Sequence, residues 1–304
     1  MFNKMIVLGC GLIGCSIAGA ARQKKIAKQI IGIETQNINY VKKLSFFDEI
    51  KNSILEVDNA DLVLICTPIA SLSQIFGDLI QQHSSRKYGL VTDVFSTKKS
   101  LLNLIFKLST PEKISFYESF LSSHPLAGSE KIGAVAANVK LFENSKILIC
   151  PFDYGNEFGE VRKKELIKQE QKKILVLESF WSSLGGIPKI LPISQHDLLF
   201  AGVSHFPHLV SFCLALILSR SQFSSQALSL HGGGLRDTTR IAGASPDLWA
   251  DIIYDNKDQV LDLIMEWSVN WNELANALRN SDKEKLIKLK KQSNNKWLIS
   301  HGLL

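Results

Sequence analysis

Residues 121–133, LSSHPLAGSEKIG, place His124 directly before a proline and close to a Ser-Glu pair. This stretch is too polar and too rich in turn-forming residues to be a core element. The ordinary pKa of an imidazole lies near neutrality, so His124 is a candidate general base for the proton of a substrate hydroxyl. The residue types alone equally allow a histidine that only shapes a turn.

Ser96, in TDVFSTK, is a second candidate catalytic residue. It follows a predicted strand, where its hydroxyl could hold the imidazole of His124 or bind the substrate hydroxyl. The other interpretation is a serine that caps the start of a helix. A base beside a hydroxyl suits hydride transfer from a hydroxyl-bearing carbon, and that reaction needs a hydride acceptor.

A glycine-rich segment near the N-terminus predicts a site for such an acceptor. GCGLIG has the GxGxxG spacing, follows a strand-like MIVL run and precedes a helical pattern. Gly9 permits a tight turn, Gly11 lets the backbone approach a pyrophosphate, and Gly14 lets helix and strand pack closely. The N–H groups at Leu12 and Ile13 open the predicted helix and would face the phosphates.

Glu34 predicts which dinucleotide is bound. An acidic residue about 20 positions after the glycines should hydrogen-bond the adenosine ribose, and Glu34 ends the predicted second strand at that distance. Its carboxylate would repel a 2′-phosphate, so the sequence favours NAD over NADP; a plain surface glutamate is the alternative. Thr67 and Pro68 end another predicted strand and are further candidates, unless the proline only terminates the strand.

SHFPH contains three candidate substrate-binding residues, Ser204, His205 and His208. A proline inside a helix bends the chain and often borders a cavity. Partly buried histidines packed at the kink are the alternative. The two histidines lack a third ligand, so we expect no metal site.

GGGLRDTTRIAG contains two arginines beside flexible glycines. Arg240, which precedes an apolar turn, is the candidate for binding a carboxylate through its planar guanidinium. A surface salt bridge to Asp237 is the alternative, and we expect it for Arg236.

Alternating strand and helix patterns predict the fold that positions these groups. KMIVLGC, QIIGIE, ADLVLICTP, YGLVTDV and KILICP are strand-like, which predicts parallel βαβ units, and SFYESFLSS is expected to be a further strand before His124. No strand is evident after residue 193. We therefore expect an α/β fold, with a Rossmann-type dinucleotide-binding domain over residues 1–193 and an all-helical domain over residues 194–304. A charged surface insertion is expected at about residues 153–173.

The helical half contains two predicted helix starts and an apolar stripe. Ser194 and Asp197 have the spacing of a capping box, and Ser245 before Pro246 is a second N-cap. The stripe has helical spacing and predicts an amphipathic helix. Its members are Val260, Leu263, Ile264, Trp267, Trp271, Leu274 and Leu278.

Composition argues against several other classes of protein. Lys and Arg are dispersed and the net charge is only +6, so we expect no nucleic-acid partner but a bias towards small anionic ligands. Five scattered cysteines without a CxxC pair predict a reducing compartment. The longest apolar run, residues 209–218, is shorter than the roughly 20 residues that span a bilayer. We expect a cytoplasmic protein with no membrane partner.

GCGLIGCS, ICTP, TDVFSTK, SHPLAGSEKIG, HDLLFAGVSHFPH and GGGLRDTTRIAGASPDLW occur in the order found in prephenate/arogenate dehydrogenases. The chain resembles this family over nearly its whole length, apart from the charged stretch. The resemblance implies NAD(P)-dependent oxidative decarboxylation of a cyclohexadienyl substrate. It matches His124 to the catalytic histidine and Ser96 to a serine near the substrate hydroxyl and the nicotinamide.

The resemblance also assigns substrate-binding residues and a partner. Arg240 matches an arginine that binds a substrate carboxylate. The other matches in or near the pocket are Glu130, Ser204, His205, His208 and Trp249. The helical domain of the family forms an intertwined homodimer, which would cover the apolar stripe; packing within its own domain is the alternative.

The predicted reaction is oxidation of prephenate to 4-hydroxyphenylpyruvate with NAD. Some arogenate-preferring relatives lack the histidine matched by His208, which favours prephenate, and arogenate with NAD or NADP is the alternative. A β-hydroxyacid dehydrogenase would carry a lysine in the glycine-rich segment where this chain has Arg240. A non-catalytic cofactor-sensing protein need not retain His124.

Overall fold

The computed structural model describes residues 1–83, 87–128, 133–155, 158–220, 225–294 and 299. Contacts between residues divide the chain into two compact units, Met1–Asn256 and Lys257–Leu304. Every described residue of the candidate site lies in the first unit.

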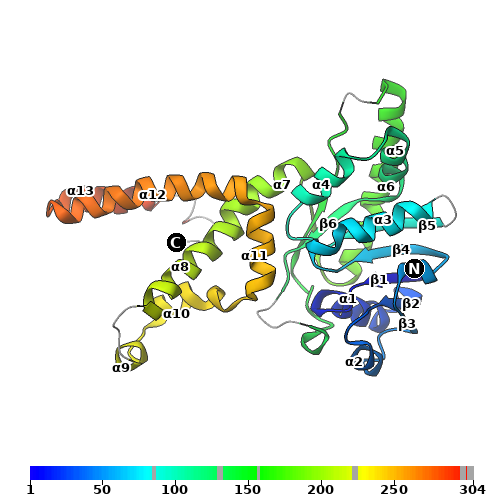
Figure 1. Ribbon diagram of the computed structural model, residues 1–304, viewed down its shortest axis with the longest axis horizontal. Helices are drawn as coiled ribbons and strands as arrows, with labels where there is room; N and C mark the ends of the chain where they lie inside the picture. The colour runs from blue at the N-terminus through cyan, green and yellow to red at the C-terminus, as the bar shows by residue number, and fades with distance from the viewer. Residues whose placement is uncertain (84–86, 129–132, 156–157, 221–224, 295–298, 300–304) are drawn as a thin grey trace. The chain divides into compact units, whose positions relative to one another are not determined.

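A five-stranded parallel sheet forms the centre of the N-terminal half (Figure 1). Its order is β3-β2-β1-β4-β5, which is typical of the Rossmann-type fold predicted, with the strand order reversing beside β1. The strands are β1 (Phe2–Leu8), β2 (Ala27–Ile33), β3 (Glu49–Lys51), β4 (Asn59–Ile65) and β5 (Lys87–Asp93). All pairs are parallel, so the carboxyl ends of β1, β2, β4 and β5 meet at one edge.

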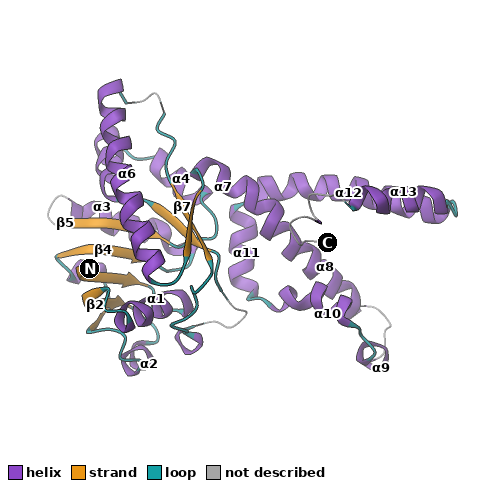
Figure 2. Ribbon diagram, turned by 180° about the vertical axis from the view of Figure 1, so that it is seen from behind, coloured by secondary structure: helices purple, strands orange, loops and turns teal. Residues whose placement is uncertain are grey.

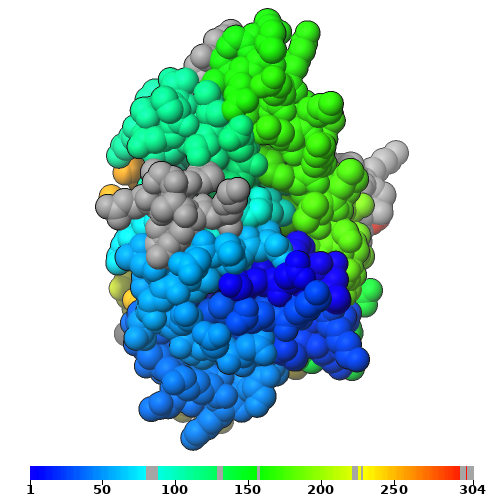
Figure 3. All heavy atoms as spheres, turned by 90° about the vertical axis from the view of Figure 1, so that its right-hand side faces the viewer, coloured from blue at the N-terminus to red at the C-terminus, as the bar shows by residue number. Residues whose placement is uncertain are grey.

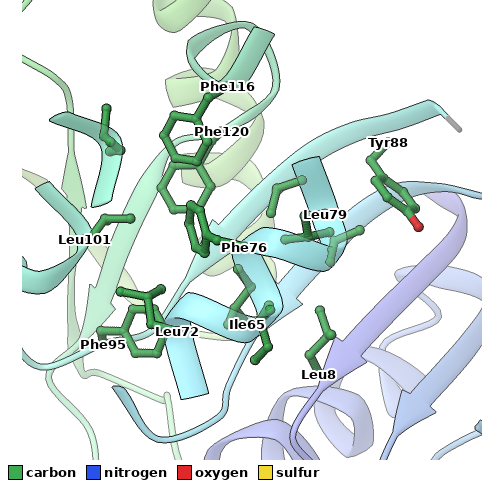
Figure 4. Packing of buried hydrophobic residues seen from close by; sticks show 14 of the residues in the cluster. Leu8, Ile65, Leu72, Phe76, Leu79, Tyr88, Phe95, Leu101, Phe116 and Phe120 are labelled. Carbon is green, nitrogen blue, oxygen red and sulfur yellow. The ribbon is translucent and has the colours of Figure 1, made fainter. Parts of the chain in front are cut away.

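Helices cover both faces of this sheet because successive strand residues point in opposite directions. Met5 and Val7 of β1 pack in a cluster with α1 and α6, whereas Ile6 and Leu8 pack in a second cluster with α3 and α5. Figure 4 shows the second cluster, in which Phe76 of α3 lies beside Phe116 and Phe120. The helices of this half are α1 (Leu12–Gln23), α2 (Ile38–Lys43), α3 (Leu72–His83), α4 (Lys99–Phe106), α5 (Thr110–Ser119) and α6 (Glu160–Ser183).

His124 lies in a second sheet with the order β6-β7-β8. Its strands are β6 (Ser122–Pro125), β7 (Lys146–Cys150) and β8 (Ile187–Ile190). The expectation of a strand over SFYESFLSS is wrong for its first part, since α5 continues to Ser119. Ser109 and Glu112 form a capping box at the start of α5. Near the end of this helix, Phe116 stacks on Phe120, and their ring centroids are 4.5 Å apart.

The expected surface insertion at residues 153–173 is instead largely part of α6 (Figure 2). This 24-residue helix buries Leu166, Glu170 and Lys173 despite its charged sequence. The carboxylate of Glu170 accepts hydrogen bonds from the backbone N–H of Phe152 and the hydroxyl of Tyr154, and Lys173 donates to backbone carbonyls. Long charged side chains can be buried when their ends find such partners.

The far end of α6 packs against the start of the chain. Phe180 of α6 contacts Phe2 edge to face, with ring centroids 6.0 Å apart. Figure 3 shows the outer face of this half, where the green segment that contains α6 adjoins the dark blue N-terminal residues. The helix is therefore integral to the nucleotide-binding half.

The rest of the first unit is helical within the described residues, as predicted. Its helices are α7 (Ile193–Phe200), α8 (Phe206–Arg220), α9 (Ser225–Ser229), α10 (Gly233–Thr239) and α11 (Pro246–Asp255). One π-helical turn, Ala201–His205, joins α7 to α8. Ser245 is the N-cap residue of α11 with Pro246 at its first position, as predicted.

The predicted capping box of Ser194 and Asp197 is wrong. The helix α7 begins two residues earlier than predicted, at Ile193, with Pro192 in place of Ser194 as its N-cap residue. The carboxylate of Asp197 instead accepts hydrogen bonds from the backbone N–H groups of Lys98 and Lys99, at the start of α4. Asp197 therefore binds the N-terminus of α4, which is distant in the sequence, and does not cap α7 as the local spacing predicted.

One helical segment among the described residues, Ile193–Arg220, is long and apolar enough to cross a membrane by length and composition. Residues 209–218, expected to be too short for a span, are only part of it. The same segment carries His196 and Asp197, which are hydrogen-bonded to the nucleotide-binding half. Those buried polar contacts are typical of a helix packed within a protein.

The second unit contains α12 (Lys257–Arg279) and α13 (Lys283–Ser293). The predicted apolar stripe lies on α12, where the rings of Trp267 and Trp271 stack with centroids 5.8 Å apart. Their exposed fractions are 42% and 59%. The stripe is thus only partly covered by its own chain.

A buried ion pair connects the end of β5 to β6. The ammonium of Lys98 lies 2.5 Å from Asp93 Oδ2 and donates to the backbone carbonyls of Phe95 and Ser123, each at 2.9 Å. Both charged side chains are fully buried. The loop that carries Ser96 and the strand that carries His124 are therefore joined through one side chain.

We predict that Lys98→Met lowers the free energy of unfolding by about 3–5 kcal/mol, because it leaves Asp93 charged, buried and without its partner. Urea unfolding measures this loss. The double variant Lys98→Met/Asp93→Asn should be less destabilised than the sum of the two single variants. Additive losses would contradict a coupled pair.

Candidate active site

The imidazole of His124 is buried and held at one nitrogen. Its Nδ1 lies 2.9 Å from Nε2 of His196, and its ring packs against Phe200 with centroids 5.1 Å apart. Among the described residues its Nε2 has no hydrogen-bond partner, and the side chain is 7% exposed. Burial lowers the pKa of His124 well below its ordinary value, assisted by His196 and Lys98. At neutral pH the ring is therefore uncharged.

Ser96 lies in the loop between β5 and α4, half-buried beside the buried ion pair. Burial lowers the pKa of His205, and the Ser96 backbone lies close enough to that imidazole to raise its pKa against this larger lowering. The loop follows Asp93, the last residue of β5, so it leaves the sheet at the edge where its parallel strands end. This is the position at which such sheets bind ligands.

His205, predicted to bind substrate, lies in a buried position. It is 1% exposed, and its Nδ1 lies 3.0 Å from Nδ2 of Asn256. The same Asn256 nitrogen donates to the carbonyl of Asp197 at 2.7 Å, which identifies it as the amide NH₂. Nδ1 of His205 therefore accepts from Asn256, and substrate contact by its other nitrogen stays a prediction.

His208, Trp249 and Arg240 form a second group. The rings of His208 and Trp249 stack with centroids 3.4 Å apart, and His208 Nδ1 bonds the carbonyl of Ser204 at 2.9 Å. Burial lowers the pKa of His208, and the charge of Arg240 lowers it further. No carboxylate of the described residues lies within 4.0 Å of the Arg240 guanidinium, whereas Arg236 lies 3.9 Å from Asp237 as predicted.

Ring contacts connect the two groups. Phe200 packs against His124 and also lies near His205, with centroids 6.4 Å apart. His205 in turn meets Trp249 edge to face at 6.3 Å. The candidate base thus borders a set of rings that continues through Trp249 to His208, whose pKa is lowered by burial and by the charge of Arg240. Glu130, also predicted to lie here, is outside the described residues.

The glycine-rich loop has the geometry that a dinucleotide requires. Gly9 has φ +89°, and a side chain there would meet the Cys66 carbonyl at 2.8 Å. A side chain at Gly14 would lie 2.0 Å from the Gly9 carbonyl, whereas one at Gly11 would meet nothing within 4 Å. Gly11 is the N-cap residue of α1 and supplies no side-chain cap, so the N–H groups that open the helix at Leu12 and Ile13 can bind a phosphate.

Glu34 and Thr67 flank this loop. Glu34 accepts hydrogen bonds from the backbone N–H of Cys10, at 3.1 Å, and from those of Thr35 and Gln36. Its oxygens retain lone pairs for ribose hydroxyls. The hydroxyl of Thr67 is buried without a partner among the described residues, and Pro68 leads into a turn, Ile69–Ser71, that contacts α11. Together, the N–H groups of the glycine-rich loop, the carboxylate of Glu34 and the hydroxyl of Thr67 supply hydrogen-bonding groups that fit a dinucleotide.

No group of three His, Cys, Asp or Glu side chains suited to a metal ion occurs in the described part of the chain. Within the described residues, the hydrogen-bond partners of His124, His196, His205 and His208 include an imidazole, a carboxylate, an amide and a backbone carbonyl. A neutral imidazole that keeps one nitrogen available is suited to proton transfer.

Several residues of the site were missed from the sequence. His196, Asp197 and Asn256 lie beside the base through contacts between segments far apart in the chain. The adjacent His-Asp pair in SQHDLLF was the available signal, but its Asp197 was assigned to a helix cap. Nothing in the local sequence marks Asn256.

Two family models match the chain. The nucleotide-binding domain of prephenate dehydrogenase matches residues 17–175, and its dimerization domain matches residues 192–292. The chain is 30% identical over 296 residues to a prephenate dehydrogenase of Bacillus subtilis (strain 168), covering 95% of this chain and 73% of that protein. It is 24% identical to a cyclohexadienyl dehydrogenase of Zymomonas mobilis, covering 96% and 94%.

Solved structures share the fold. A prephenate dehydrogenase from A. aeolicus, in complex with hydroxyphenyl propionate and NAD⁺, superposes with a TM-score of 0.75 at 24% identity, covering 96% of each chain. The arogenate dehydrogenase of Synechocystis gives a TM-score of 0.70 at 24% identity, covering 96% of this chain and 97% of that one. Together with the matched domains, these comparisons establish that the chain belongs to the prephenate dehydrogenase family of NAD(P)-dependent oxidoreductases of tyrosine biosynthesis.

Proposed function

We propose that the chain converts prephenate to 4-hydroxyphenylpyruvate and CO₂, with His124 taking the proton of the ring 4-hydroxyl. The observation that carries this proposal is the state of the His124 ring. One nitrogen is held by His196, the other has no partner among the described residues, and burial keeps the ring neutral. A neutral imidazole with one free nitrogen is suited to act as a general base.

The bond changes balance with NAD as the one co-substrate, which would accept the hydride. The 4-hydroxyl loses its proton to His124 as C4 loses hydride, and the ring then carries a carbonyl at C4. The bond from C1 to the carboxylate breaks, its electron pair enters the ring, and CO₂ leaves. His124 returns its proton to the resulting phenolate oxygen. Bound NAD supplies the hydride acceptor in this reaction.

Other residues would position the substrate. Ser96, half-buried in the loop after β5, would donate to or accept from the 4-hydroxyl. Arg240, with no carboxylate partner among the described residues, would bind a substrate carboxylate beside His208 and Trp249. His208 has its Nδ1 occupied by the Ser204 carbonyl, so only its Nε2 could contact substrate.

The cofactor proposed is NAD. Glu34 lies at the end of β2 and touches the glycine-rich loop at Cys10, where a ribose 2′-phosphate would meet its negative charge. We further propose a cytoplasmic homodimer. The matched dimerization domain and the partly exposed stripe with Trp267 and Trp271 support the dimer, and the unpaired cysteines suit a reducing compartment.

The direct test supplies prephenate or arogenate, each with NAD or NADP, and follows the absorbance of the reduced cofactor. We expect the highest kcat/KM with prephenate and NAD. Preference for arogenate would reassign the substrate while keeping the chemistry. Absence of turnover in all four combinations would overturn the proposed function.

For His124→Asn we predict a fall in kcat of roughly 10²- to 10⁴-fold, because the base is lost. The affinity for NAD, measured by fluorescence titration, should not change. His231→Asn, at an exposed position outside the site, is the matched control. A variant at His124 that kept its kcat would show that another group takes the proton.

For Arg240→Gln we predict an increase in the KM for substrate of about 10- to 100-fold, corresponding to one charge-assisted interaction. The KM for NAD should change little. Arg236→Gln, which removes an arginine already near Asp237, is the control. Equal effects on substrate and cofactor would argue against a carboxylate-binding role for Arg240.

A further inference from the structure

A chain of three side chains ends at the candidate base. Nδ1 of His124 lies 2.9 Å from Nε2 of His196, and Nδ1 of His196 lies 2.7 Å from Oδ1 of Asp197. The two imidazoles are 7% and 0% exposed. Each of these contacts needs one donor and one acceptor, so the protonation of Asp197 determines where every proton in the chain lies.

The carboxylate of Asp197 faces donors only. Oδ1 accepts from the backbone N–H of Lys98 at 2.9 Å, and Oδ2 accepts from the N–H groups of Lys98 and Lys99 at 3.0 and 2.8 Å. These groups open α4, where the helix dipole favours an anion. Burial raises the pKa of Asp197, while these N–H groups and the Lys98 ammonium oppose the rise. The donor geometry assigns the ionised form.

The position of each proton follows from that carboxylate. His196 must donate to it from Nδ1, and burial lowers the pKa of His196 to about 2, so its ring is neutral and its Nε2 carries no hydrogen. The bare Nε2 of His196 can only accept. Nδ1 of His124 must therefore be the donor across the 2.9 Å contact, which leaves Nε2 of His124 without a hydrogen.

Packing holds the chain in this geometry. The rings of His196 and Phe200 stack with centroids 4.6 Å apart and an interplanar angle of 8°. The amide of Asn256 donates to the backbone carbonyl of Asp197. The opposite arrangement, with Nε2–H of His196 donating to His124, would place a bare Nδ1 against a carboxylate oxygen at 2.7 Å. Two acceptors at that distance repel each other.

We propose that Asp197 and His196 are positioning residues that hold His124 as the Nδ1–H tautomer, with Nε2 as the only atom able to take the substrate proton. This inference rests on the proposed function, since it explains how His124 is prepared as its base. When Nε2 takes the proton, the bond from Nδ1–H to His196 becomes charge-assisted, and no proton has to pass to His196.

Asp197→Asn is the variant expected to reverse the donor and acceptor roles along the hydrogen bonds from Asp197 through His196 to His124. Backbone N–H groups can only donate, so the amide oxygen must face Lys98 and Lys99, and the NH₂ must face His196. His196 would then accept at Nδ1 and donate from Nε2, and the hydrogen of His124 would move to Nε2. We expect kcat to fall on the order of 10³- to 10⁴-fold, as when a catalytic histidine is held in the wrong tautomer. The KM should change little.

A matched pair of substitutions at His196 separates positioning from packing. In His196→Gln, the amide NH₂ can donate to Asp197 while the amide oxygen accepts from His124, so the tautomer is kept. In His196→Leu, the acceptor is lost. We expect the glutamine variant to retain a kcat roughly 10- to 100-fold above that of the leucine variant, about the effect of one hydrogen bond to a charged group. Thermal melting of each variant shows whether it is folded.

The tautomer itself can be observed by NMR of the full chain labelled with [¹⁵N]histidine, in which His124→Asn assigns one of the seven histidines. We expect His124 to be protonated at Nδ1 in the wild type and at Nε2 in Asp197→Asn. Asp153→Asn, at an exposed position after β7, is the control and should change neither kcat nor the spectrum.

The outcomes separate this inference from the proposed function. Protonation of wild-type His124 at Nε2, or unchanged kcat and spectrum in Asp197→Asn, would overturn the positioning role. The NMR measurement needs no turnover, so a wild type that is inactive with every substrate but shows the Nδ1–H tautomer would refute the proposed function and leave the positioning intact.

Discussion

The geometry of the site depends on a fully buried ion pair between the ammonium of Lys98 and the carboxylate of Asp93. Taking two charges out of water costs several kcal/mol for each ion, and only a full set of partners offsets that cost. Lys98 obtains these partners from Asp93, the carbonyl of Phe95 and the carbonyl of Ser123. Because the ammonium needs all three, the loop after β5 and the strand β6 have essentially one relative position. The candidate hydroxyl and the candidate base come from those two segments.

A second set of buried contacts joins the helices of the first unit to this frame. Asp197 binds the N-terminus of α4 through its carboxylate and Asn256 through its carbonyl. Ser100, in the first turn of α4, bonds Asp255 at the end of α11. The helices that carry the proposed substrate-binding groups are therefore held to the same loop as the ion pair. One polar network supports both the base and the place where an anionic substrate would bind.

The parts of the fold with local signals were predicted correctly. Alternating apolar runs identified β1, β2, β4, β5 and β7, but the expectation that all five belong to parallel βαβ units is wrong for β7, which pairs antiparallel with β6 in a separate sheet. The glycine spacing predicted the turn between β1 and α1, where Gly14 leaves no room for a side chain. The short strands β3 and β8 have three and four residues, which is too few for an alternation of apolar and polar residues to be recognised. The charged sequence of α6 was misinterpreted because the partners of Glu170 and Lys173 lie in other segments.

The sequence by itself determined the inventory of the site: a histidine before a proline, a serine at a strand end, an arginine beside glycines and an acid after the second strand. Each of these is a local pattern, in which residue type and spacing over a few positions set the chemistry that is available. Only the tertiary structure decided that Nδ1 of His124 is occupied while Nε2 has no partner among the described residues, and that His205 bonds Asn256. It also brought His196, 72 residues away, to the base. The physical reason is that a buried hydrogen bond forms between whichever donor and acceptor the packing brings together, and no short stretch of sequence contains both.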